Sequence, residues 1–412
     1  MAHLRDRRAF GNIGTRKFRG ARFGDALSPR FSGLLDQYGG AAAAYSLRAL
    51  SSGWLAGDVV EVRPSSGWTP ASFTAGQVAN GEMVDYVKRP GNFTNVDFET
   101  FSNNGTGDGF TATNSASTGF AYASTVSGAA TDTVTVDFDI TIISGSPAIS
   151  LRNGAPPIAP SVSGTPIVIS TSGSKSIMMT ATGNFVNFTF SEGDVPAEFT
   201  VSNVRVSTND GFVSKWYDQS GNANDATQAT TTAQPKIVDA GALVVGGLDF
   251  DGVDDSLVTA STVLGDTFTS AMVVRNDSTP VSGSFFSQHQ GGAANRFGLT
   301  ADTTLPYGYR FFKQGLAPAF LDTTTDISSS DQLSFVVKSG VAVGMYIDGG
   351  ANEGGNLGSS AILGALLAIG AAEEGAGGYG SFRASELILY NTDQSANRVG
   401  IETNINDFYT IY

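Results

Sequence analysis

The sequence contains no cysteine and only two histidines, His3 and His289, among its 412 residues. The absence of cysteine excludes disulfides, thiolate metal sites and cysteine nucleophiles. A Ser-His-Asp site would have to use His289, and a metal site built on several histidines is disfavoured. A chain without disulfides suits folding in a reducing cytosol.

Long hydrophobic runs are also missing. The longest apolar run, residues 361–372, is 12 residues long, whereas a membrane-spanning helix needs about 20. The amino terminus is basic and lacks the apolar segment of a signal peptide. We therefore expect no membrane insertion and synthesis in the cytoplasm.

Charged residues are scarce. They make up 15% of the chain, against about 25% in an ordinary globular domain. Glycine is abundant, with 51 residues, and the net charge is −14. This composition predicts many short strands joined by tight turns, and the length suggests two or three domains.

The basic residues are concentrated at the amino terminus, where residues 1–30 hold eight basic and two acidic side chains. Such a glycine-rich segment cannot build its own core, so we expect residues 1–27 to be an extended docking arm. Its arginines would meet carboxylates of a partner and its phenylalanines would fill pockets. A solvated tail is the alternative, and nucleic acid is disfavoured because the acidic remainder would repel phosphates. The proposed anchoring residues are Arg5, Arg7, Arg8, Phe10, Arg16, Lys17, Phe18, Arg19, Arg22 and Phe23.

Residues 28–92 are expected to form a helical neck and connector. Ser28 is a candidate N-cap, with Pro29 at the first helical position. A second helix is expected over residues 41–50, where alanine is frequent. The apolar face of the first helix would consist of Phe31, Leu34, Leu35 and Tyr38.

Strand patterns begin near residue 93. Apolar residues alternate with Thr135, Asp137, Asp139 and Thr141, which predicts a half-buried strand with one wet face. A change of parity after Val201 predicts a β-bulge near Ser202. Residues 93–208 therefore read as a β-sandwich of the carbohydrate-binding-module type.

A second all-β domain is expected over residues 209–412. Residues 333–337 and 341–347 alternate on both sides of Lys338-Ser339-Gly340, which predicts a hairpin. Ile401, Ile405, Phe408 and Tyr412 share one stripe of a probable carboxyl-terminal helix. The predicted fold class is all-β, with two jelly-roll or β-sandwich domains after a basic arm and short helices.

Two groups of motifs resemble known families. Residues 44–50, 57–63 and 216–228 (WYDQSGNANDATQ) resemble segments of the catalytic domain of α-L-arabinofuranosidase B. Residues 248–255 (LDFDGVDD) and 345–349 (MYIDG) are similar to laminin G and concanavalin A-like jelly rolls. Together with the ending DQSANR, the mixture resembles virion proteins of tailed bacteriophages.

The resemblance implies a virion structural protein of a tail fibre, spike or baseplate, assembled in the host cytoplasm. Residues 1–35 would bind other virion proteins, the chain would form a homo-oligomer such as a trimer, and the sandwiches would contact host surface glycans. One alternative is a capsid decoration or head fibre protein. Another is a glycoside hydrolase of the arabinofuranosidase type.

We expect no enzymatic activity. A glycosidase needs two carboxyl groups flanking the scissile bond, and no nucleophile or general acid can be placed in this sequence. Asp218, Glu373 and Glu374 are the only carboxylates that suggest themselves, and all three suit solvated loops.

The WYDQSGN motif favours a structural role, because its polar residues are turn formers that bond their own backbone. Trp216 and Tyr217 are large apolar bodies suited to wedging between elements. A glycan or metal contact is the alternative. The candidate glycan-binding residues are Trp216, Tyr217, Asp218, Asn222, Asn224, Tyr307 and Tyr309.

The densest acidic cluster comprises Asp249, Asp251, Asp254 and Asp255. Several carboxylate oxygens together suit Ca²⁺, although the residue order is not that of an EF-hand loop. The alternative is a set of acids at a wet turn. No cofactor is required by the sequence, and Ca²⁺ is the one metal ion that it suggests.

Overall fold

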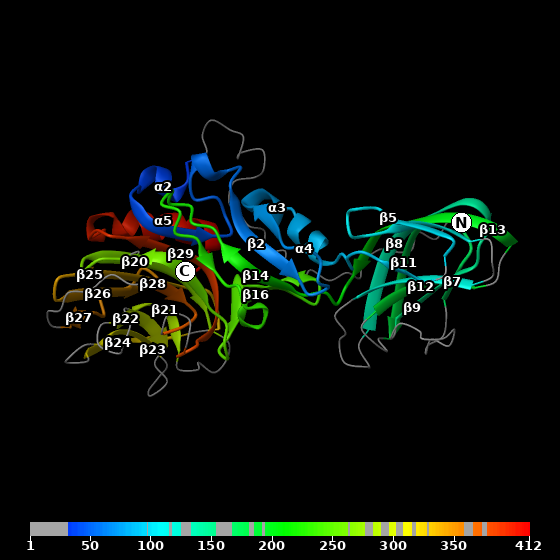
Figure 1. Cartoon of the computed structure of the whole chain (residues 1–412). Helices are drawn as coiled ribbons and strands as arrows, with labels where there is room; N and C mark the ends of the chain where they lie inside the picture. Colours follow the sequence, from blue (N-terminus) through cyan, green and yellow to red (C-terminus); the bar gives the residue numbers. More distant parts are fainter. Residues whose placement is uncertain are drawn as a thin grey trace, which may run out of the picture.

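The computed structural model of the chain contains two β-rich bodies, a larger one and a smaller one (Figure 1). It describes residues 32–96, 98–114, 118–124, 133–153, 167–180, 185–191, 194–262, 264–276, 283–289, 296–301, 308–314, 319–327, 329–357, 366–372 and 377–412. The predicted arm, residues 1–27, and Tyr307 lie outside the described residues. Within the described part, no helix is long and apolar enough to span a membrane.

The larger body is built from both ends of the chain. Its helices are α2 (Leu34–Gln37), α3 (Ala75–Ala79), α4 (Glu82–Val87) and α5 (Arg398–Tyr409). Its strands are β1 (Ala41–Ser46), β2 (Asp58–Pro64), β3 (Ala71–Thr74), β14 (Gly211–Trp216), β15 (Ala226–Thr227), β16 (Lys236–Asp239), β17 (Ala242–Leu243), β18 (Leu248–Asp251), β19 (Leu257–Thr262), β20 (Phe268–Arg275), β21 (Ser284–His289), β22 (Arg296–Ala301), β23 (Gly308–Gln314), β24 (Ala319–Asp326), β25 (Gln332–Ser339), β26 (Ala342–Ile347), β27 (Gly355–Asn356), β28 (Leu366–Ile369) and β29 (Ser381–Tyr390).

Strand β29 is central to this body. It pairs antiparallel with β20 on one side, and with β1 and β18 on the other. The β20–β25–β26 layer faces the β21–β22–β28 layer, and Met272 and Val336 from the first share a core with Phe297 and Leu367 from the second. The predicted hairpin of residues 333–347 is confirmed as β25 and β26.

The outer face of this layer is covered by helices. Ala271 and Phe335 pack in one cluster with Leu34 of α2 and with Ile401 and Ile405 of α5. This explains why β20 and β25 are buried on both faces. The predicted carboxyl-terminal helix is confirmed for Ile401, Ile405 and Phe408. The helix ends at Tyr409, so the placement of Tyr412 on its stripe is wrong.

The expected helix over residues 41–50 is wrong, because residues 41–46 form β1. All six residues are buried: Ala44 packs toward the helices, and Tyr45 packs toward the main core. Alanine favours helices in isolation, but tertiary packing overrides that weak preference. Residues 28–31, with the candidate N-cap Ser28, lie outside the described residues. Residues 32–92 combine the short helices α2, α3 and α4 and a 3-10 turn (Ser52–Trp54) with β1, β2 and β3.

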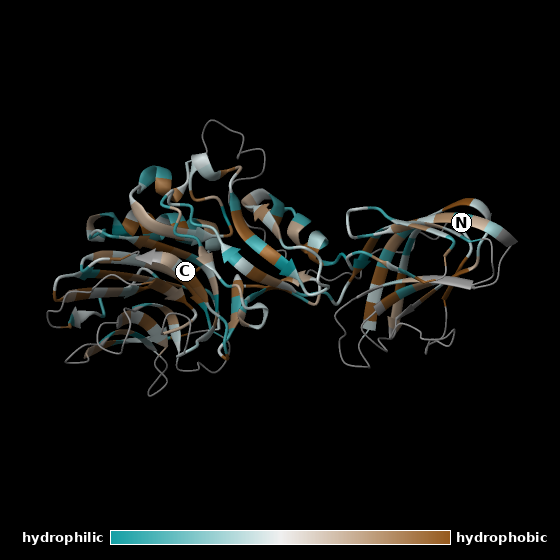
Figure 2. Cartoon of the chain, in the orientation of Figure 1, coloured by the Kyte–Doolittle hydropathy of each residue, from teal (hydrophilic) through white to brown (hydrophobic). Residues whose placement is uncertain are grey.

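The smaller body is a β-sandwich of two five-stranded sheets, ordered β10-β9-β12-β7-β4 and β11-β8-β13-β6-β5. Phe138 of β8 and Phe188 of β12 meet between the sheets, with ring centroids 5.1 Å apart. Figure 2 shows hydrophobic residues alternating with hydrophilic ones along strands of both bodies. The all-β fold class is confirmed. The strands are β4 (Thr94–Val96), β5 (Thr100–Asn103), β6 (Phe110–Asn114), β7 (Thr118–Ser124), β8 (Thr133–Ser146), β9 (Ile149–Asn153), β10 (Ile167–Ile169), β11 (Gly173–Thr180), β12 (Phe185–Ser191) and β13 (Asp194–Val206).

The chain enters the smaller body after Lys88 and leaves it after Val206. These two segments lie together, and we call this place the joint. The backbone N–H of Val206 donates to the carbonyl oxygen of Lys88, at 2.8 Å. Trp68 of the larger body lies against Gly107 of the smaller one, where a Cβ atom would come within 2.5 Å of the indole. The two segments that connect the bodies are thus hydrogen-bonded to each other, and residues of both bodies pack together beside them.

Candidate functional site

The WYDQSGN motif forms the loop after β14, and hydrogen bonds hold this loop against strand β1. The Asp218 carboxylate accepts hydrogen bonds from the backbone N–H groups of Ala44, Ser220 and Asn224, at 2.8 to 3.0 Å. It also accepts one from the Ser220 hydroxyl, at 2.8 Å. The Asn222 side chain donates to the Ala41 carbonyl oxygen, at 2.9 Å. These bonds match the structural role predicted for the motif.

The alternative glycan-binding role is contradicted for two of its residues. Trp216 and Tyr309 are both fully buried, so neither ring can meet a ligand at the surface. Tyr217 is half-buried, and its hydroxyl lies 2.8 Å from the Ser72 hydroxyl. The aromatic residues that the sequence suggested for glycan contact are therefore core or loop-packing residues wherever the structure describes them.

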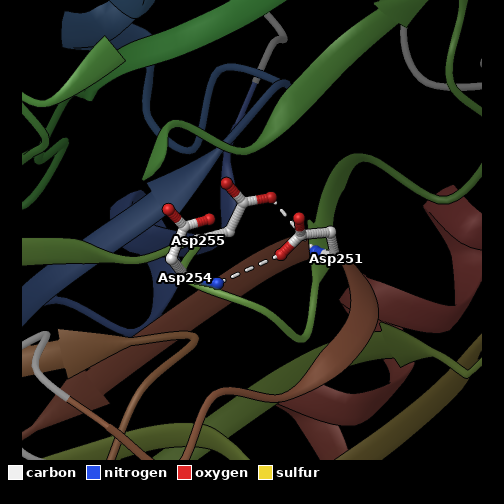
Figure 3. Close-up of side chains that lie close together, drawn as sticks. All are labelled: Asp251, Asp254 and Asp255. Atoms are coloured by element: carbon white, nitrogen blue, oxygen red, sulfur yellow. Dashed lines mark hydrogen bonds between the residues drawn. The ribbon is translucent and has the colours of Figure 1, made fainter. Parts of the chain in front are cut away.

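The acidic cluster sits at the end of β18, where Asp251, Asp254 and Asp255 gather around one turn (Figure 3). Their nearest carboxylate oxygens all lie within 4.8 Å of one another. Asp251 accepts from the Val253 backbone N–H at 2.8 Å, as turn-forming aspartates do. Asp249 lies outside this group and pairs with Arg383 at 3.2 Å.

Asp255 is the unusual member of the acidic cluster. Burial, together with the nearby carboxylates of Asp251 and Asp254, raises the pKa of its carboxyl group to about 7. The backbone N–H of Asp251 donates to it at 3.1 Å. A carboxyl group that keeps its proton near neutral pH can act as an acid, and the same three side chains can offer oxygens to a cation. The other sequence candidates for an acid, Glu373 and Glu374, lie outside the described residues.

A second candidate site lies on the smaller body. The outer face of the β11-β8-β13 sheet carries a hollow of about 380 Å³, which we call the sheet-face hollow. Its volume lies within the range of small-molecule sites. The lining residues are Asp137, Phe138, Asp139, Ser174, Lys175, Ser176 and Asn203.

The backbone register explains how these side chains meet. Asp139 of β8 lies opposite Ser174 of β11 and Ser202 of β13. The pairing of β13 is irregular between Ser202 and Arg205, which confirms the predicted bulge, and Asn203 there has a left-handed φ of 54°. The bulge thus directs an extra amide to the rim of the hollow.

Asp139 organises the sheet-face hollow. It accepts a hydrogen bond from the Ser174 hydroxyl and one from the Asn203 amide, the latter at 2.7 Å. These two bonds hold the pKa of its carboxyl group below the ordinary value. The hollow therefore presents carboxylate, amide and hydroxyl groups in fixed positions, which suits a ligand rich in hydroxyl groups.

The sequence pattern indicated only some of the residues of the sheet-face hollow. Alternation placed Asp137 and Asp139 together on the wet face of one strand. It did not indicate that Ser174 and Asn203 come to the same place from neighbouring strands. The site was missed because the strand order and register could not be read from one sequence.

No family model and no curated protein match the chain. Among solved structures, Trypanosoma rangeli sialidase in complex with sialic acid matches 48% of this chain at 19% identity and a TM-score of 0.34. Domain 4 of a GH43 extracellular arabinanase from Geobacillus stearothermophilus, in complex with arabinotriose, matches 47% at 11% identity and a TM-score of 0.32. The matches cover 31% of the sialidase chain and 91% of the arabinanase domain.

These matches correct one expectation. The expectation that the chain is not an enzyme is contradicted, because the matched structures are a sialidase and one domain of an arabinanase. The matches place no catalytic residue in this chain, so any activity is a matter for proposal and experiment. The resemblances to bacteriophage virion proteins and to arabinofuranosidase B stay predictions.

Proposed function

We propose that this chain is a glycan-binding protein that recognises carbohydrate at the sheet-face hollow. The observation that carries the proposal is the arrangement around Asp139, whose carboxylate is fixed by Ser174 and Asn203 at the rim of a hollow. Sugar hydroxyls need paired donors and acceptors at set positions, and a fixed carboxylate, amide and hydroxyl supply them.

The setting that we propose for this function is a bacteriophage particle. The basic arm, residues 1–27, would attach the chain to other virion proteins, and the acidic remainder would present the two bodies to host surface glycans. Deletion of residues 1–27 should remove the protein from purified particles while the two bodies stay folded. Retention of the truncated chain on particles would contradict this setting.

Glycan binding is tested with the purified full chain on an array of neutral and acidic glycans. Asp139→Ala should weaken binding about tenfold, because a charged hydrogen-bonding group at the site is lost. Asp407→Ala is a matched control, since Asp407 is an exposed carboxylate on α5 and does not line the sheet-face hollow. An Asp139→Ala chain that binds as wild type would rule out this site.

A second candidate function is glycoside hydrolysis at the acidic cluster. The observation in its favour is that Asp255 has a pKa of about 7 and lies within 4.8 Å of Asp251 and Asp254. Retaining glycosidases use two carboxyl groups about 5 Å apart, one protonated and one ionised. Asp255 would donate its proton to the leaving oxygen as the glycosidic bond breaks, and Asp251, the exposed member, would form a bond to the sugar carbon. Water, deprotonated by Asp255, would then displace Asp251 and release the sugar.

Hydrolysis is tested by release of reducing sugar from arabinan and of sialic acid from sialyl glycans. Asp255→Asn keeps the shape of the side chain and should abolish release, whereas Asp407→Asn should leave it unchanged. No release by the wild-type chain from any polysaccharide would end this candidate.

A further inference from the structure

A second hollow lies on the larger body, around helices α3 and α4 next to the joint. We call it the joint hollow. Its volume is about 360 Å³, and it shares no residue with the sheet-face hollow. Ligand sites occur preferentially where domains meet, and this hollow lies at such a place.

The turn between the two helices supplies polar groups. Asn80 is the C-cap residue after α3, and Gly81, with a left-handed φ of 82°, is the N-cap residue before α4. Gln77, Asn80 and Glu82, from α3, this turn and α4, all line the joint hollow. Gln77 is held by a capping box, in which its side-chain oxygen accepts from the Thr74 backbone N–H at 2.9 Å.

Aromatic rings form another part of the wall. The rings of Phe73 and Tyr86 pack edge to face, with centroids 5.4 Å apart. The Tyr86 hydroxyl donates to the Thr69 carbonyl oxygen at 2.6 Å, and the Arg89 guanidinium lies 5.2 Å from the ring centroid. The Tyr86 ring is thus held in one orientation at the hollow.

Two lining residues also hold the smaller body. Asp85 accepts two hydrogen bonds from Arg205, at 2.7 and 2.9 Å. Arg89 donates to the Thr106 carbonyl oxygen at 3.1 Å. A molecule in the joint hollow therefore lies against side chains that connect the two bodies.

We propose that the joint hollow binds one neutral sugar unit of a glycan. Amide and carboxylate groups can pair with sugar hydroxyls, and a fixed tyrosine ring offers an apolar surface for the sugar ring. Glu82, Asp85 and Asp108 place three carboxylates around the two guanidinium groups of Arg89 and Arg205, and this excess of negative charge disfavours an anionic sugar. This inference rests on the proposed glycan binding for its class of ligand and adds a second site with its own residues.

The test uses the full chain on the glycan array, with Asn80→Ala and Glu82→Gln as joint-hollow variants. Both should weaken binding of neutral glycans about tenfold, since each removes one hydrogen-bonding group. Asp407→Asn is the control for charge, and thermal unfolding confirms that each variant is folded. Glu82→Gln retains the size of the side chain and guards against a loss caused by misfolding of Asn80→Ala.

The outcomes separate the two sites. Loss of neutral glycans by the joint-hollow variants supports this inference, whether or not Asp139→Ala also weakens binding. Loss by Asp139→Ala alone overturns this inference and leaves the proposed function standing. A wild-type chain that binds no glycan overturns both.

Discussion

Arg48 and Glu386 lie 338 positions apart in the sequence and form a bidentate ion pair inside the larger body. The guanidinium donates to both carboxylate oxygens, at 2.7 and 2.9 Å. Ser46 and Tyr409 also donate to Glu386, at 2.8 and 3.1 Å. The pair joins the segment after β1, strand β29 and helix α5 in one buried network.

Glu386→Ala should lower the free energy of unfolding by about 3–5 kcal/mol, because it leaves the Arg48 charge without its partner in the interior. Chemical denaturation measures the change. Asp322→Ala is the matched control, since it breaks the more exposed Arg310–Asp322 pair and should cost under about 1 kcal/mol. Equal losses in the two variants would contradict a special role for the buried pair.

Asp218→Ala should destabilise the larger body by about 2–4 kcal/mol, because several backbone donors lose one acceptor. Hydrogen exchange should become faster at the amides of Ala44 and Asn224, which donate to this carboxylate. Asp407→Ala should change neither stability nor exchange. Unchanged exchange at Ala44 in the Asp218 variant would show that the motif does not fasten β1.

The stability of the chain should depend on pH through Asp255. The folded state holds this proton up to a pH of about 7, whereas the ordinary pKa is 3.8. The unfolded chain releases the proton first, so this group lowers the free energy of unfolding as pH rises from about 4 to 7. Asp255→Asn should remove that decline, which denaturation at a series of pH values measures.

A control and a metal test accompany this prediction. Asp407→Asn should retain the wild-type pH dependence, and a decline that persists in Asp255→Asn would contradict the assignment. If the acidic cluster holds Ca²⁺, millimolar CaCl₂ should raise the Tm of the wild-type chain at pH 8 and not that of Asp251→Asn. An equal Tm with CaCl₂ and with chelator would exclude the calcium site suggested by the sequence.

Arg205→Ala should loosen the joint without unfolding either body. Arg205 bonds Asp85 of the larger body and also Asp108, at 2.9 Å, in the smaller one. Small-angle X-ray scattering should show a broader distribution of distances between the bodies. Arg310→Ala, which removes an arginine far from the joint, should scatter as wild type; an unchanged Arg205→Ala profile would assign the rigidity to backbone bonds alone.

The sequence predicted those features whose signal is local. Alternation around Asp137 and Asp139 identified β8, and the parity change at Ser202 identified the bulge, because a strand has a period of two residues. Spacing of Ile401 and Ile405 identified α5 in the same way. The acidic turn at Asp251 was found because turn formers cluster in sequence.

Features that depend on residues far apart in the sequence could not be predicted from the sequence. Ala44 lies in a strand because its neighbours in space bury it, and alanine alone indicates a helix. Nothing in the local sequence distinguishes the buried Glu386 from an exposed acidic residue, because its partner Arg48 lies on another part of the chain. The sheet-face hollow needs Ser174 and Asn203 beside Asp139, and only the strand register brings them there.

The closeness of Lys88 and Val206 at the joint has one more consequence. Since the chain departs and returns through neighbouring, hydrogen-bonded segments, the smaller sandwich is an insertion whose two ends nearly touch. Such an arrangement is compatible with replacing the whole insert by a short turn, or by an unrelated domain with adjacent ends. An exchanged insert would present its own surface at the same place, while the larger body keeps its architecture.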